Sequence, residues 1–93
     1  MSLTYQQFKE IIDTFGDSMI LCQKINNVLQ RQKAPNSSKN VLHLLTDLHH
    51  LCDDNNTFTN DLRLSLKSLF LIYQDRDVEC LSIFEELCQM LRQ

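Results

Sequence analysis

The second half of the chain consists of three apolar segments with helical spacing, separated only by short polar breaks. The segments read VLHLLTDLHHL, DLRLSLKSLFLIY and VECLSIFEELCQML, and the breaks between them contain CDDNN and QDRD. Their apolar residues recur every three to four positions, which is the period of an amphipathic helix. Because the chain has only one glycine and one proline, it lacks the frequent turns of an all-β fold. The sequence therefore predicts an all-α fold.

The first half is expected to add two more helices, separated at Gly16. Thr4 and Gln7 form a capping-box pattern before the first of them. Gly16 offers a C-cap, and the polar residues after it offer a new N-cap. Glycine inside a helix costs about 1 kcal/mol relative to alanine, so two helices are favoured over one long one. Residues 30–40 form a polar connector with room for one short helical turn before Pro35.

The expected architecture is thus a compact antiparallel bundle of five to six short helices in a single domain, residues 1–93. Each helix of the second half has two candidate starting or capping residues, Ser37 or Ser38, Thr59 or Asn60, and Asp75 or Asp77. The apolar positions predict a core that includes Phe8, Ile12, Phe15, Leu21, Leu45, Leu48, Leu66, Leu69, Phe70, Leu81, Phe84 and Leu87.

Charge is distributed unevenly along the chain. The net charge is −3, which argues against a nucleic-acid partner because phosphate binding needs a basic surface. Residues 18–46 contain four bases and no acids, whereas residues 47–86 contain nine acids and three bases. Such bipolar charge suits head-to-tail association of copies, in which one face meets the opposite face of the next. No apolar run reaches the ~20 residues that span a bilayer.

Chemistry-bearing residues do not form a recognisable site. The four cysteines stand at 22, 52, 80 and 88 without a C-x-x-C pair, which favours reduced, buried cysteines in a cytoplasmic protein. His49 and Cys52 could offer two metal ligands on one helix, but the other cysteines lack ligand spacing. We therefore expect no metal, no other cofactor and no enzymatic activity.

Four segments of the second half follow one another in a characteristic order: LHLLTDL (42–48), CDDNN (52–56), LKSLFLIY (66–73) and QDRDVE (74–79). They resemble segments of the death effector domain, a subfamily of the death-fold superfamily. In order, they are similar to the family's leucine-rich helix, its polar loop, its L-K-x-L-L-x-x-I helix and the R-x-D-L-L turn that opens the last helix. The resemblance implies a six-helix death fold that assembles homotypically, as an adaptor in apoptosis or innate immune signalling.

The R-x-D-L turn is only partly matched. Asp75 stands where the family has arginine, Asp77 and Val78 match the last two positions, and Arg76 is one residue out of register. The family's acidic partner on the second helix is missing unless Asp17 supplies it. We therefore expect the charge triad of the family to be absent or rearranged.

Eight residues are predicted to bind protein partners, which are other death-fold domains or further copies of this chain. The basic region 24–39 of one copy is expected to meet the acidic region 75–86 of the next. One predicted face carries Lys24, Ile25, Arg31 and Lys33. The other carries Asp75, Arg76, Asp77 and Glu79.

An alternative function is suggested by Phe8, Ile12, Phe15, Gly16 and Asp17, followed by Met19. These residues resemble the Bcl-family helix that docks in a groove through apolar anchors and a Gly-Asp pair, which would make the protein an apoptosis regulator. Helix-in-groove binding requires such anchors on one exposed helical face. A further small helical-bundle adaptor also fits the pattern. Gly16→Glu discriminates, because only groove binding leaves no space for a side chain there.

Overall fold

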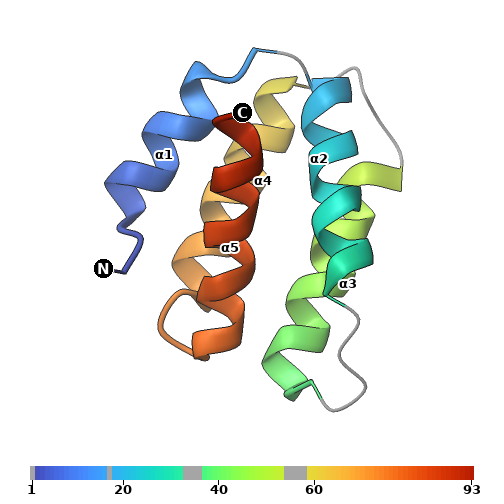
Figure 1. Ribbon diagram of the computed structural model, residues 1–93, viewed down its shortest axis with the longest axis vertical. Helices are drawn as coiled ribbons and strands as arrows, with labels where there is room; N and C mark the ends of the chain where they lie inside the picture. The colour runs from blue at the N-terminus through green and yellow to red at the C-terminus, as the bar shows by residue number, and fades with distance from the viewer. Residues whose placement is uncertain (1, 17, 33–36, 54–58) are drawn as a thin grey trace.

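Five helices make up the part of the chain that the structure describes. The computed structural model describes residues 2–16, 18–32, 37–53 and 59–93. Figure 1 shows that consecutive helices alternate in direction, so the bundle is antiparallel. The all-α prediction is confirmed, with no strand in these four ranges. Of the connector predicted at 30–40, residues 30, 31, 39 and 40 are helical, and residues 33–36, where the short turn before Pro35 would end, lie outside the described residues. The helices are α1 (Tyr5–Thr14), α2 (Ser18–Arg31), α3 (Lys39–Asp53), α4 (Thr59–Tyr73) and α5 (Val78–Leu91).

Helix starts follow the predicted capping residues. The Thr4 hydroxyl accepts a hydrogen bond from the backbone N–H of Gln7 at 3.1 Å, and the Gln7 side chain accepts one from Thr4 N–H at 2.9 Å. This reciprocal pair satisfies two N–H groups that a helix N-terminus otherwise leaves without partners. Before α3, the Ser38 hydroxyl accepts from Val41 N–H at 3.2 Å. Asp77 caps α5.

The predicted break between the first two helices is confirmed, but Gly16 does not form its C-cap. α1 ends at Thr14, and Phe15 follows in an extended conformation with its N–H bonded to the Ile12 carbonyl. No described glycine has a positive φ, so the left-handed cap that favours glycine is not used here. Instead the Arg63 guanidinium of α4 donates to the Phe15 carbonyl and, at 3.1 Å, to the Gly16 carbonyl.

Three phenylalanines form the centre of the core. Phe8 of α1 stacks on Phe70 of α4 with ring centroids 4.6 Å apart. Phe84 of α5 meets Phe8 and Phe70 edge-on, at 5.3 and 5.1 Å. All three side chains are fully buried. Since α5 packs against each of the other four helices, this cluster joins α1 and α4 to the helix at the centre of Figure 1.

The predicted core is confirmed, with a difference in depth. Eight of its twelve residues are buried, and the remaining four, Phe15, Leu45, Leu69 and Leu81, are half-buried against it. Cys22, Cys80 and Cys88 are buried as expected, Cys52 is half-buried, and none of the four forms a disulfide. The residues that the prediction omitted are mostly on α2 and α5, where Ile25, Val28, Ile83 and Met90 are also buried.

Candidate functional site

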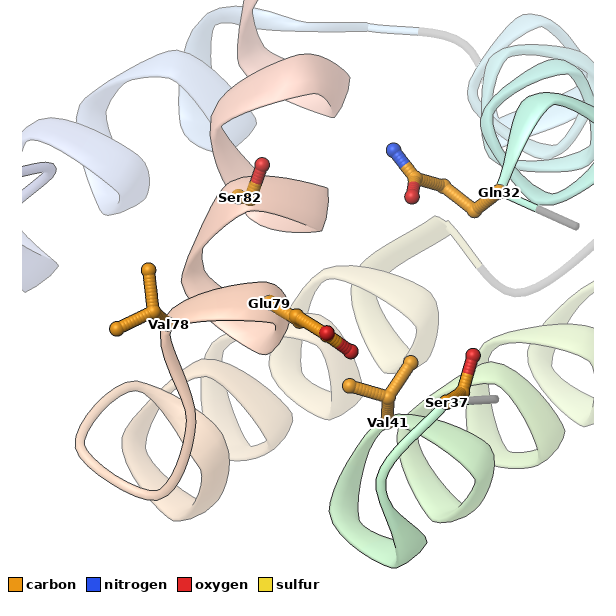
Figure 2. Close-up of a pocket in the computed structure, with 6 residues that line it drawn as sticks. All are labelled: Gln32, Ser37, Val41, Val78, Glu79 and Ser82. Atoms are coloured by element: carbon orange, nitrogen blue, oxygen red, sulfur yellow. The ribbon is translucent and has the colours of Figure 1, made fainter. Parts of the chain in front are cut away.

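A hollow of about 320 Å³ lies where the end of α2 and the beginnings of α3 and α5 approach one another. Figure 2 shows Glu79 directed towards Val41 and Gln32 directed towards α5. The hollow combines two apolar side chains, two hydroxyls, an amide and a carboxylate. It is lined by Gln32, Ser37, Val41, Val78, Glu79 and Ser82.

Polar contacts between α2 and α5 form one edge of this hollow. The Gln32 amide donates to a carboxylate oxygen of Glu86, and Arg31 Nη1 lies 3.7 Å from the other oxygen. The Arg31 side chain is 66% exposed, whereas that of Glu86 is 22% exposed. Ion pairs at such exposure contribute only about 0–1 kcal/mol, so the Arg31–Glu86 pair adds little to the stability of the fold.

Asp77, predicted both as a possible helix cap and as a partner-binding residue, has a structural role. As the N-cap of α5, its carboxylate accepts a hydrogen bond from Glu79 N–H at 2.8 Å. It also accepts one from the hydroxyl of Ser38, the residue before α3. These hydrogen bonds lower the pKa of Asp77 below the usual aspartate range, and the one from Ser38 has the largest effect. Asp77 therefore joins two helix starts, and reversing its charge would disturb the fold as well as any interface.

The assignment of Ile25 to a partner-binding surface is wrong. Its side chain is completely buried within α2, in the same core cluster as Leu21 and Val28. The three lie at i, i+4 and i+7, on one face of the helix. The apolar residues that α2 does expose are Met19 and Ile20, at 51% and 44%.

The other predicted partner-binding residues lie at the surface where the structure describes them. Lys24 is half-buried on α2, and Asp75 and Arg76 are exposed in the turn after α4. Glu79 is exposed at the hollow. Lys33 lies outside the described residues. The exposed members of the set can therefore contact a partner without rearrangement of the core.

The two predicted faces are not fully separate. Arg31 pairs with Glu86, and Glu79 lies two turns before Glu86 on the same helix, α5. Gln32, next to Arg31, lines the same hollow as Glu79. Arg31 thus lies beside the acidic helix of its own chain and not on a face opposite to it.

A second surface, between α3 and α4, was not anticipated from the sequence. We call it the α3–α4 groove; it holds about 460 Å³ and is lined by Asp47, His50, Leu51, Leu64, Ser65, Ser68 and Leu69. Leu64 is 61% exposed at this groove, and Leu71 and Ile72 further along α4 are 52% and 50% exposed. The available signal was that α4 carries leucines outside its buried stripe, so it is apolar on more than one face.

Two of the buried thiols, those of Cys80 and Cys88, are expected to be poorly reactive. Burial raises the pKa of Cys80 and of Cys88 to about 11, so both stay protonated near neutral pH and are poor nucleophiles. Within the described ranges no group of three or more His, Cys, Asp or Glu side chains is placed to hold a metal ion. The described helices include none that combines the length and the apolar character needed to cross a bilayer.

Residues 8–19 do not form one exposed helix. Phe8 and Ile12 are fully buried in the core, and α1 ends at Thr14, before Phe15 and Gly16. A Cβ at Gly16 would meet nothing within 4 Å. Presenting these anchors to a Bcl-type groove would require α1 to leave the bundle.

Comparison of the chain with protein-family models, with curated proteins and with solved structures finds no match.

Proposed function

We propose that this domain is a non-enzymatic protein–protein interaction module that assembles with further copies of itself or with other death-fold domains. One observation carries the proposal. Seven large apolar side chains, at positions 19, 20, 42, 64, 71, 72 and 78, are between 44% and 84% exposed around a well-filled core. Exposed apolar surface that groups on one element is typical of interaction sites. On α4 three of these residues, Leu64, Leu71 and Ile72, lie on one side.

The charged surface supports the same function. Asp75, Arg76 and Glu79 are exposed around the turn between α4 and α5. Val78, in the middle of this turn region, is 84% exposed. An apolar side chain surrounded by charges of both signs gives a partner both a contact and an orientation. The bipolar charge of the chain and its similarity to the death effector domain favour homotypic assembly, as an adaptor in apoptotic or innate immune signalling.

None of the four cysteines forms a disulfide, which fits a reducing compartment, so we infer a cytoplasmic site of action.

Light scattering of the purified protein against concentration tests this function. The expected result is growth in mean mass with concentration, and less growth at high salt because salt screens the exposed charges. Glu79→Lys should weaken the assembly, since Glu79 lies exposed at the hollow. Glu10→Lys, at an exposed acid of α1, is the matched control and should assemble like the wild type. A monomer at every concentration and salt would contradict the proposal.

A further inference from the structure

The α3–α4 groove offers an apolar floor with an exposed apolar rim. Leu51 and Leu69 are half-buried along it, and Leu64 is 61% exposed at its edge. Ile72, three residues after Leu69 and hence on the same side of α4, is 50% exposed. A bulky apolar side chain from a partner would therefore find apolar contacts along two turns of α4.

Two carboxylates lie at or beside this groove. Asp47, which accepts a hydrogen bond from Tyr73, lines it together with His50. The exposed Asp61 lies three residues before Leu64 on the same side of α4. The two bases of α4 are held elsewhere: Arg63 donates to carbonyls at the end of α1, and Lys67 pairs with Asp13 of α1. A groove of this kind facing its own copy would place carboxylates opposite carboxylates, which disfavours a symmetric dimer through this face.

The outer face of α2 has the complementary character. α2 contains the bases Lys24 and Arg31 and no acidic residue. Near its start, Met19 and Ile20 are 51% and 44% exposed. Ile20 and Lys24 are one helical turn apart, so an apolar side chain and an ammonium group emerge on the same side of α2.

We propose that the α2 face of one copy, with Met19 and Ile20 as apolar anchors, docks into the α3–α4 groove of a second copy. Lys24 then lies beside the groove's carboxylates, of which Asp61 is the exposed one. The inference rests on the proposed function and names one contact that it uses. Because the two surfaces share no residue, each copy presents both of them, and the contact can repeat into an open-ended assembly.

Two variants, each blocking one surface, test this contact. Ile20→Arg disables the α2 face and Leu64→Arg disables the groove. Both positions are exposed, so both variants are expected to keep the circular-dichroism spectrum and melting temperature of the wild type within a few degrees. Each variant alone should need about tenfold or more higher concentration to assemble, as for loss of a central interface residue.

Mixing the two variants gives the decisive readout. An Ile20→Arg chain keeps its groove and a Leu64→Arg chain keeps its α2 face, so an equimolar mixture should form a 1:1 dimer that grows no further. Leu42→Arg is the matched control, because Leu42 is 52% exposed on α3 but does not line the groove. It should assemble like the wild type.

Assembly of either single variant at the wild-type concentration would overturn the proposed contact while leaving self-association intact. A mixture that stays monomeric where the wild type assembles, or a Leu42→Arg variant that blocks assembly, would also overturn it. A wild-type protein that never assembles would reject the proposed function together with this contact.

Discussion

Two leucines that are two residues apart on α4 provide the sharpest test of how this helix divides its apolar residues. Leu66 is fully buried in the core, whereas Leu64 is 61% exposed at the α3–α4 groove. The same substitution, leucine to alanine, should therefore have different effects at the two positions. Leu66→Ala removes buried methyl groups and leaves a cavity, which typically costs about 2–5 kcal/mol of unfolding free energy. Leu64→Ala should change it by no more than about 0.5 kcal/mol, as is usual for surface substitutions.

The loss expected for Leu66→Ala is a substantial part of the total unfolding free energy of the domain. A domain of 93 residues has a stability of about 5–14 kcal/mol. A loss of about 3 kcal/mol would lower its melting temperature by roughly 12–24 °C, since each kcal/mol corresponds to about 4–8 °C for a domain of this size. Equilibrium urea unfolding followed by far-UV circular dichroism measures both variants, at a concentration below that of assembly. Equal losses of unfolding free energy in the two variants would refute the division of α4 into a buried and an exposed face.

Three further predictions concern stability and reactivity. Arg63→Ala should cost about 1–3 kcal/mol in urea unfolding, because its guanidinium donates to the carbonyls that follow α1. Arg76→Ala is the control and should cost less, because the Arg76 side chain donates to the Ile72 carbonyl only four residues before it. Asp77 has a lowered pKa, so its hydrogen bonds stabilise the fold above the unfolded value of about 3.9, and this contribution is lost as the pH falls through the folded value. Unfolding at pH 7 and at pH 3 should therefore show Asp77→Asn less stable than the wild type at pH 7 and the difference narrowed at pH 3; a constant difference would argue against the carboxylate's role. The thiols of Cys80 and Cys88, buried and with pKa values of about 11, should react with a thiol reagent at pH 8 only on unfolding; mass spectrometry that finds them labelled as fast as Cys52 in the native protein would contradict this.

Most of the fold could be predicted because it depends on local patterns. The period of the apolar residues predicts each helix, and short polar side chains at Thr4, Ser38 and Asp77 mark three of the helix starts through hydrogen bonds within a few residues. The centre of the core followed from the same period, since the three central phenylalanines all occupy helix-spaced positions. The break after α1 was predicted at Gly16, but the group that holds it, Arg63, comes from a helix 47 residues further along the chain. No local signal reveals such a contact.

The candidate surfaces were harder to predict, because exposure depends on how the helices pack. Ile25, next to Lys24 in the sequence, was predicted to be an exposed apolar residue. The way in which α2 is rotated in the bundle buries Ile25 and exposes Ile20 instead. Asp77 was correctly predicted as a possible cap and was also assigned to an interface. Its hydrogen bonds from Glu79 N–H and from the Ser38 hydroxyl show that its carboxylate is used within the fold. The α3–α4 groove forms because α3 and α4 lie side by side. The sequence of neither helix alone predicts which helix it packs against.

Sedimentation velocity of the wild-type protein tests the central claim most directly. The protein would be measured from low to high micromolar concentration, at low and at high salt. An assembling module should sediment faster as concentration rises, and the shift should be smaller at high salt. A single species of 11.0 kDa at every concentration and both salt levels would contradict the claim that this domain acts by self-association.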